Sequence, residues 1–263
     1  MAAAVVLVAA CGGSSARDVV RAAGPQLRAA ETARLEFLFT FDLGAESRSF
    51  TMRGDGAIDY ANERSAATFA LPGAVVEIIG AGTDVYLRGP ANPFVQEPST
   101  WLHLAASAAI SDAEEALGVV TGTDPGKLLA NMELAGKVAK VGEERARVRG
   151  APTTQYHADL DPSRAMSQLT FLQRDQIDQL KQQGKQFKLG VDVWIDDDGR
   201  PRRLRSVSEV EGVISATFTT EFFDFGDDVA IAVPKADEVG ASHTVDSTSE
   251  LFDFGQRIGA AAR

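Results

Sequence analysis

The chain has 263 residues, of which 44% are apolar and 24% charged, so it is long enough to bury one generous core or two small ones. With 26 Lys and Arg against 37 Asp and Glu, its formal net charge is −11, which repels nucleic acid unless a local basic patch overrides it. One cysteine and three histidines exclude a disulfide framework and leave little material for a zinc site or a Cys/His catalytic pair. We therefore expect no metal, no cofactor and no nucleic-acid partner.

The N-terminus carries an apolar run over residues 2–10. Nine residues are too few to cross a bilayer as a helix, which takes about 20, but they match the apolar core of a secretory signal. The run ends in Val8-Ala9-Ala10-Cys11, which resembles the lipobox of bacterial lipoproteins, whose cysteine receives a diacylglyceryl group. No Lys or Arg precedes the run, so we expect residues 1–10 to be a lipoprotein signal peptide truncated at its start.

The lipobox resemblance implies an exported protein held at the outer face of the cell membrane by a diacylglyceryl group on Cys11. Two acyl chains give stable attachment, because each buried CH₂ contributes about 0.8 kcal/mol. Residues 12–15, Gly-Gly-Ser-Ser, are then a flexible tether, and residues 16–263 form a single domain. Export also agrees with a chain of this length that has no second cysteine.

The first half of this domain is predicted to be a helix followed by short strands. The helix covers residues 16–33, with an interruption at Gly24-Pro25. Residues 35–42 alternate with period two, which places Leu35, Phe37, Phe39 and Phe41 on one face of a strand. Further strands are predicted over residues 49–53, 57–60, 65–71, 75–79 and 84–88. Turns such as Gly54-Asp55-Gly56 separate them, and such a series of hairpins predicts an antiparallel meander.

In the second half, helical spacing interrupts the strands twice. Residues 111–134 place Leu117, Leu128, Leu129 and Met132 at helical intervals, and residues 163–184 carry one apolar stripe. The clearest strand, residues 187–195, alternates strictly, and Asp197-Asp198-Gly199-Arg200 joins it to the next strand as a hairpin. The remaining elements are strands over residues 137–141, 146–150, 153–160, 201–210 and 214–222, and a short helix near residues 249–258.

These elements predict an α+β fold, in which about 10–11 antiparallel strands form a large curved sheet, a half-barrel, with helices covering its concave face. Periodicity does not decide whether the helices fill the concave face completely or leave an apolar cavity. The residues predicted to line such a cavity are Leu35, Phe37, Phe39, Phe41, Met52, Val85, Leu87, Leu117, Leu128, Val191, Val193 and Phe218.

Several segments resemble the LppX/LprG group of actinobacterial lipoproteins, which is related in fold to the LolA and LolB lipoprotein carriers. They are the lipobox, the mid-chain helices, and the motifs Gly82-Thr83-Asp84-Val85-Tyr86-Leu87-Arg88, Trp101-Leu102-His103-Leu104 and Val191-Asp192-Val193-Trp194-Ile195-Asp196. The resemblance implies a half-barrel closed by helices around an apolar cavity. It also implies a ligand, which is acylated lipid, glycolipid or the acyl chains of a lipoprotein, carried between layers of the cell envelope. A membrane transporter is then a candidate partner.

This function needs no nucleophile or general base, so we expect no enzyme. Arg203 and Arg205 are candidate contacts for a lipid phosphate, although solvated strand charges are the favoured interpretation of these arginines. The alternative to a carrier is a membrane-tethered scaffold or interaction module with a filled core and no ligand. A hydrolase is disfavoured, because the chain contains neither G-x-S-x-G nor H-E-x-x-H.

Two further motifs are predicted to be structural. Asp196-Asp197-Asp198-Gly199 lacks the alternate ligand spacing and the distal Glu of a calcium loop, so we expect a turn. His103 would be catalytic only if a carboxylate and a nucleophile converged on it, and the sequence shows neither. We expect it to be a packed or surface histidine.

Overall fold

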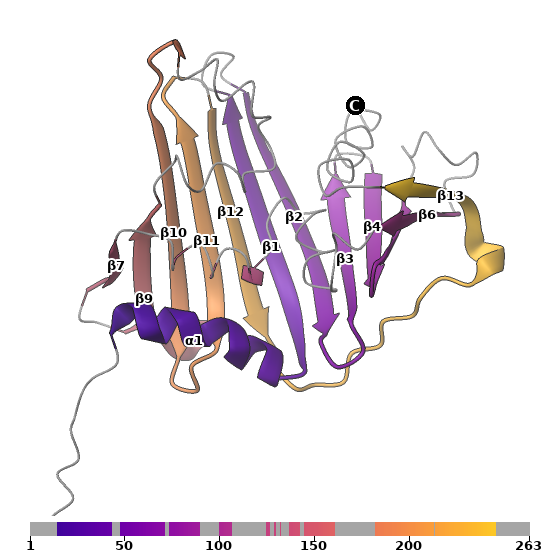
Figure 1. Ribbon diagram of the computed structural model, residues 1–263, viewed down its shortest axis with the longest axis horizontal. Helices are drawn as coiled ribbons and strands as arrows, with labels where there is room; N and C mark the ends of the chain where they lie inside the picture. Colours follow the sequence, from indigo (N-terminus) through magenta and orange to yellow (C-terminus); the bar gives the residue numbers. More distant parts are fainter. Residues whose placement is uncertain are drawn as a thin grey trace, which may run out of the picture.

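The computed structural model describes residues 15–43, 48–71, 74–89, 100–106, 125–126, 129, 132, 137–142, 145–160, 182–212 and 214–245. Within these ranges the chain forms helix α1 (Ala16–Ala29) and one open sheet of thirteen strands (Figure 1). The strands are β1 (Thr32–Leu43), β2 (Arg48–Asp59), β3 (Arg64–Leu71), β4 (Ala74–Ala81), β5 (Asp84–Arg88), β6 (Trp101–Ala106), β7 (Lys137–Lys140), β8 (Ala146–Val148), β9 (Ala151–Asp159), β10 (Phe187–Asp196), β11 (Pro201–Val210), β12 (Ile214–Phe223) and β13 (Val239–Val245).

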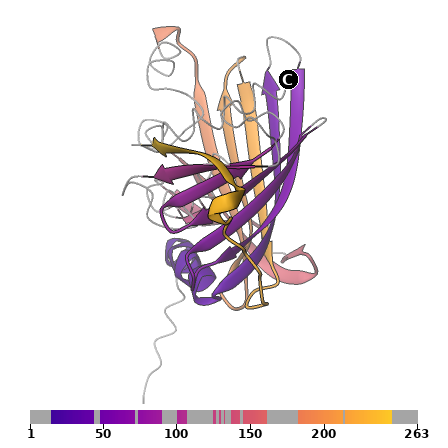
Figure 2. The same cartoon turned by 90° about the vertical axis from the view of Figure 1, so that its right-hand side faces the viewer.

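The strand order is β13-β6-β5-β4-β3-β2-β1-β12-β11-β10-β9-β7, with β8 paired to β9. All pairs are antiparallel except that β13 runs parallel to β6. The sheet is strongly twisted, so strands at the β13 end run across the direction of the central strands (Figure 2). The predicted large, curved, mostly antiparallel sheet with helix is therefore confirmed, although it has more strands than the 10–11 expected.

Helix α1 lies across one face of the sheet at the end where β1 begins (Figure 1). The hydroxyl of Ser15 caps it by accepting the backbone N–H of Asp18 at 3.2 Å. Val20, Ala23 and Leu27 form its buried stripe, which packs chiefly against β7, β10 and β11. The helix runs through Pro25, where the sequence predicted an interruption. Pro25 is exposed, and water can therefore reach the carbonyl group that its missing N–H leaves unpaired.

Strand β2 corrects a second prediction. Residues 49–53 and 57–60 were expected to be two strands separated by a Gly54-Asp55-Gly56 turn, but they form one continuous strand that pairs with β1 along its whole length. A side chain at Gly54 would collide with the ring of Phe37 and with the carbonyl oxygen of Thr68, and one at Gly56 with the carbonyl oxygen of Ala66. These glycines therefore mark close approach of neighbouring groups within the sheet.

We call the face that carries α1 the inner face and the opposite one the outer face. Leu35, Phe37, Phe39 and Phe41 share the inner face, as their alternation predicted, because their partners on β12 are the apolar or small residues of the same face. The core lies between this face and α1. Its larger members from the sheet are Leu35, Phe37, Ile58, Phe69, Ile78, Val85, Leu87, Leu102, Leu104, Val191, Val193, Ile195, Leu204, Phe218 and Phe222.

Strand β13 was not predicted. The chain reaches it from β12 along the end of the sheet, through a segment over residues 224–238 that includes the 3-10 turn η2 (Ala236–Glu238). Val229 and Ile231 of this segment are buried, and the carbonyl oxygen of Ile231 accepts a hydrogen bond from Nη1 of Arg64 at 3.1 Å. The segment thereby connects the middle of the sheet to its β6 edge.

Candidate functional site

Five phenyl rings form a continuous cluster on the inner face, across strands β3, β1 and β12. The ring of Phe37 lies 4.8 Å from that of Phe69 and 6.4 Å from that of Phe218, between centroids. Phe39 continues the cluster, 6.3 Å from Phe218 and 5.8 Å from Phe41. These separations are those of interacting aromatic pairs, so the cluster is one apolar surface rather than scattered rings.

Burial of this surface changes along β1. Leu35 is 1% exposed and Phe37 is 5% exposed, whereas Phe39 and Phe41 keep part of their surface in contact with solvent. Met52, which pairs with Phe39 on the inner face, is also partly exposed. The exposed part of the phenyl cluster therefore lies toward the end of β1 that is far from α1.

Two residues from the predicted mid-chain helices join the core near α1. Leu129 and Met132 have helical conformation and are buried in the hydrophobic core. The methyl group of Leu129 lies close to Gly24 of α1, 3.7 Å from where a Cβ would stand. Leu117, Leu128 and Cys11 lie outside the described residues, as do residues 163–181 and the helix expected near residues 249–258.

The other residues predicted to line a cavity also lie on the inner face. Val85 and Leu87 of β5 are fully buried, as are Val191 and Val193 of β10, and Phe218 is 5% exposed. The pairing of Val193 with Leu204 and of Leu87 with Ile78 confirms their shared face. Their role in lining a cavity stays a prediction.

On the outer face, arginine side chains cover several aromatic rings. Arg203 lies over Trp194 at 5.3 Å from the ring centroid, and its Nε donates to Oε1 of Glu221 at 2.9 Å. Arg88 lies 4.4 Å from the ring of Trp101 and forms a bidentate pair with Glu77, at 2.7 and 2.9 Å. A third arginine, Arg149, covers Phe223 on this face, with its guanidinium 3.8 Å from the ring centroid.

The two arginines predicted to contact a lipid headgroup both lie on the outer face, opposite the phenyl cluster. Arg203 is engaged by Glu221 and Trp194, and Nε of Arg205 lies 3.3 Å from Oδ2 of the buried Asp192. Both guanidinium groups already have a carboxylate partner. Their headgroup role stays a prediction, and it would place a phosphate on the outer face.

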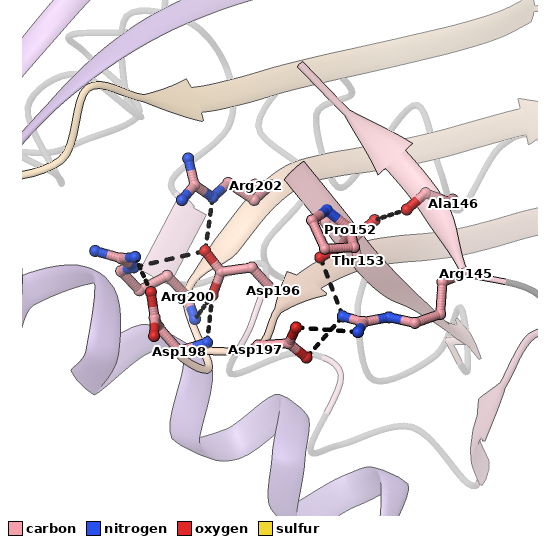
Figure 3. Close-up of polar contacts among 9 residues, drawn as sticks. All are labelled: Arg145, Ala146, Pro152, Thr153, Asp196, Asp197, Asp198, Arg200 and Arg202. Carbon is pink, nitrogen blue, oxygen red and sulfur yellow. Dashed lines mark hydrogen bonds and ion pairs between the residues drawn. The ribbon is translucent and has the colours of Figure 1, made fainter. Parts of the chain in front are cut away.

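The acidic motif between β10 and β11 forms the predicted hairpin turn (Figure 3). One carboxylate oxygen of Asp196 accepts the backbone N–H groups of Asp198 at 3.0 Å and Arg200 at 2.9 Å, while Nε of Arg202 donates to the other at 2.7 Å. Arg145 holds Asp197 through two hydrogen bonds, at 3.0 and 2.7 Å. Within the described ranges, no group of three His, Cys, Asp or Glu side chains is placed to hold a metal ion.

His103 has neighbours that the sequence did not reveal. Its Nε2 lies 2.8 Å from Oδ1 of Asp84, its Nδ1 lies 3.4 Å from Oγ of Ser242, and its ring stacks on Tyr86. These residues belong to the adjacent strands β5, β6 and β13, whose register pairs His103 directly with Tyr86 and Ser242. Strand pairing alone thus places these groups side by side, so we describe them as a cross-strand polar ladder. The sequence analysis missed this ladder because no local pattern shows which strands are neighbours, and β13 was not predicted.

In the part of the chain that the structure describes, no helix is long and apolar enough to cross a membrane. No protein-family model and no curated protein matches the chain.

Comparison with solved structures gives likenesses of low sequence identity. LprF from Mycobacterium bovis matches 83% of this chain and 96% of its own, at 10% identity and a TM-score of 0.46. The Mycobacterium tuberculosis lipoprotein LppX matches 81% and 98%, at 11% identity and a TM-score of 0.46. A LolA-superfamily protein from Nitrosomonas europaea matches 82% and 96%, at 9% identity and a TM-score of 0.34. LprF and LppX bear names of the group whose motifs the sequence resembles, and a likeness at these TM-scores assigns neither ligand nor activity to this chain.

Proposed function

We propose that this chain is a cell-envelope lipoprotein that binds the acyl chains of a lipid, glycolipid or lipoprotein on its inner face and carries them between membrane layers. The observation that supports the proposal most is the partly exposed apolar surface of Phe39, Phe41 and Met52. Leaving such a surface in water is unfavourable by about 25 cal/mol per Å², and hydrocarbon would cover it.

The contrast between the two faces supports the same proposal. Outer-face rings such as Trp194 are covered by arginines that are themselves neutralised by glutamates. Among the described residues, the cation–π contacts involve none of the five rings of the phenyl cluster, which contact one another instead. The inner face therefore offers the surface that acyl chains favour.

The energetics suit a carrier. Moving thirty CH₂ groups out of water would release about 24 kcal/mol, which exceeds the limit of non-covalent affinity. The tails of a membrane lipid start in hydrocarbon, however, so their transfer to an apolar face is close to balanced. The protein then lowers the barrier by keeping the tails dry, and the anchor on Cys11 holds it at the membrane.

The alternative function is a membrane-tethered scaffold with a filled core. It is favoured by the β4–β6 part of the inner face, where Ile78, Val85, Leu87, Leu102 and Leu104 are all at most 3% exposed. Binding of lipid distinguishes the two functions, because a filled core takes up none.

The test uses the soluble variant Cys11→Ser, purified without detergent and titrated with a fluorescent fatty acid. Organic extracts of the same preparation are examined by mass spectrometry. We expect saturable binding and co-purified acyl species. The absence of both would overturn the proposal in favour of the scaffold.

The matched pair Phe39→Asp and Leu38→Asp tests where the lipid binds. The two residues are adjacent in β1 and both partly exposed, but they lie on opposite faces. A carboxylate at position 39 has to be desolvated against the acyl chain, so Phe39→Asp should weaken fatty-acid binding by about tenfold or more. Leu38→Asp should change it less than about twofold. Equal effects of the two variants, at melting temperatures that show both to be folded, would contradict binding on the inner face.

A further inference from the structure

The inner face is closed at the end where α1 crosses it, which we call the lower end. There α1 contributes Val20 and Leu27 to the core, and the sheet contributes Leu35 and Leu204, each 1% exposed. The side chain of Gln26 extends this cover to the β10–β11 turn, where its Cγ lies 3.4 Å from where a Cβ of Gly199 would stand. No acyl chain can reach the face there without displacing the helix.

The opposite, upper end is where apolar surface remains accessible. From Leu35 to Phe41, β1 advances six residues, about 20 Å at 3.3 Å per residue. Phe39, Phe41 and Met52 lie toward this upper end and are partly exposed, and we call them the rim. Across the sheet on the same face, Ser206 pairs with Phe218 and Ser208 with Ala216, and both serines are partly exposed as well. The accessible rim is therefore apolar, with a few hydroxyl groups beside it.

The proposed membrane anchor, Cys11, precedes the helix that lies at the lower end. Cys11 precedes the helix cap Ser15 by 15 − 11 = 4 residues, which span at most about 14 Å when fully extended. From its start at Thr32, β1 carries Phe41 about 30 Å up the sheet. With the lower end held at the bilayer, this tether is too short for the domain to invert and point its rim into the same bilayer.

We propose that lipid enters at the rim formed by Phe39, Phe41 and Met52, and that the short tether directs this rim away from the anchoring membrane, toward a second lipid surface that faces it. The inference rests on the proposed function and adds the direction of exchange. Phenyl and thioether side chains make favourable apolar contacts with hydrocarbon. The composition of the rim therefore favours a lipid surface as the partner over a hydrogen-bonding peptide.

The test uses the full lipidated chain reconstituted into phosphatidylcholine vesicles. A self-quenched fluorescent phospholipid is placed either in the anchoring vesicles or in a second vesicle population, and its extraction is followed by dequenching. We expect extraction from the second population to be at least about fivefold faster. Equal or faster extraction from the anchoring vesicles would overturn the inference.

A longer tether supplies the matched variant. Inserting 20 Gly and Ser residues between Ser14 and Ser15 gives a segment whose extended length is about 80 Å, enough for the domain to turn over. We expect extraction from the anchoring vesicles to rise to the rate of the second population, with that second rate unchanged. An unchanged low rate would show that tether length does not set the direction, and would overturn the inference.

The soluble Cys11→Ser protein separates this inference from the proposed function. If it binds neither fatty acid nor vesicle lipid, the proposed function fails. If it extracts vesicle lipid while the anchored chain prefers its own vesicle, only the direction of exchange is wrong. If it binds fatty acid yet neither form extracts lipid from any vesicle, the assignment of a lipid surface as partner is wrong and a protein must deliver the ligand.

Discussion

Gly54 determines how closely β1 and β2 can pack on the inner face. Its hydrogen leaves the space that the Phe37 ring occupies, and the carbonyl oxygen of Thr68 on β3 lies only 2.5 Å from where a Cβ would stand. The backbone of β3 cannot move aside without breaking its pairing with β2. The first ring of the phenyl cluster thus depends on a missing side chain in the neighbouring strand.

We therefore expect Gly54→Ala to lower the free energy of unfolding by about 2–4 kcal/mol, through displacement of Phe37 or of the β3 backbone. Urea denaturation measures this change. Gly24→Ala is the matched control, because a Cβ there would meet Leu129 at the ordinary contact distance of 3.7 Å. Its effect should stay within about 1 kcal/mol. Equal losses in the two variants would show that close approach at Gly54 is not the cause.

His157 on the outer face has two carboxylate neighbours. Its Nδ1 lies 2.9 Å from Oδ1 of Asp192 and its Nε2 lies 3.2 Å from Oδ1 of Asp159. Gln155 donates to the same oxygen of Asp192, and Arg205 lies beside its other oxygen. Burial lowers the pKa of His157, but hydrogen bonds and charge attraction from the two aspartates outweigh it, so the pKa is raised above 6.5.

This raised pKa predicts a pH dependence of stability. The contribution of His157 is fully present below pH 6.5 and is lost as the pH rises through the higher pKa of the folded state. Its side chain is 38% exposed, so the contribution should stay below about 1 kcal/mol. Urea denaturation of the native chain and of His157→Gln should therefore differ more at pH 5.5 than at pH 8.5. A difference that grows toward pH 8.5 would contradict the assignment.

At the scale of elements, the β8–β9 hairpin is fastened to the outer face by one residue of its turn. Arg149 and Gly150 both have positive φ, 49° and 82°, as a tight two-residue hairpin requires. From this turn Arg149 pairs with Glu36 of β1 and Glu221 of β12 and lies over Phe223. The hairpin is thereby attached to strands that are not its sheet neighbours.

Arg149→Ala keeps the backbone conformation of the turn and removes these contacts. We expect the hairpin to open locally more often, with amide hydrogen exchange over residues 146–153 faster by about tenfold and little change elsewhere. Arg147→Ala is the control, since Arg147 bonds within the turn to the carbonyl oxygen of Gly150. If both variants exchange alike, the attachment to β1 and β12 contributes nothing to the hairpin.

Elements with strong alternation or turn chemistry could be predicted from sequence, and others could not. The strand β10, the Asp-Gly hairpin and the strand β11 were found within a residue of their bounds, because period-two burial and a tight turn leave a local pattern. The break predicted in β2 was wrong, because glycines that admit a close neighbour look like turn glycines when the neighbour is unknown. Strand β13 carries mostly small and polar residues, so nothing local distinguished it from a loop.

For the whole molecule, the sequence predicted which side chains share a face but not which strands are neighbours. The phenyl residues of β1 and Phe218 could be assigned to an apolar face from alternation alone. Their contact depends on the pairing of β1 with β12, and no local pattern encodes that pairing. For the same reason the sequence contained the residues of the His103 ladder without showing that they meet. The exposure gradient along the inner face depends on where α1 crosses the sheet, and strand periodicity does not reveal that position.

The pairing of β1 with β12 also has a consequence for biosynthesis. Leu35 lies opposite Phe222, and every strand from β2 to β11 is made between them. Until residues 214–223 have been translated, β1 has one unpaired backbone edge, and the phenyl rings beside it lack their neighbours on β12. Chaperones and proteases recognise such features in incomplete chains. A chain that ends before residue 214 would therefore lack a central strand of the sheet, β12, and not only an edge strand.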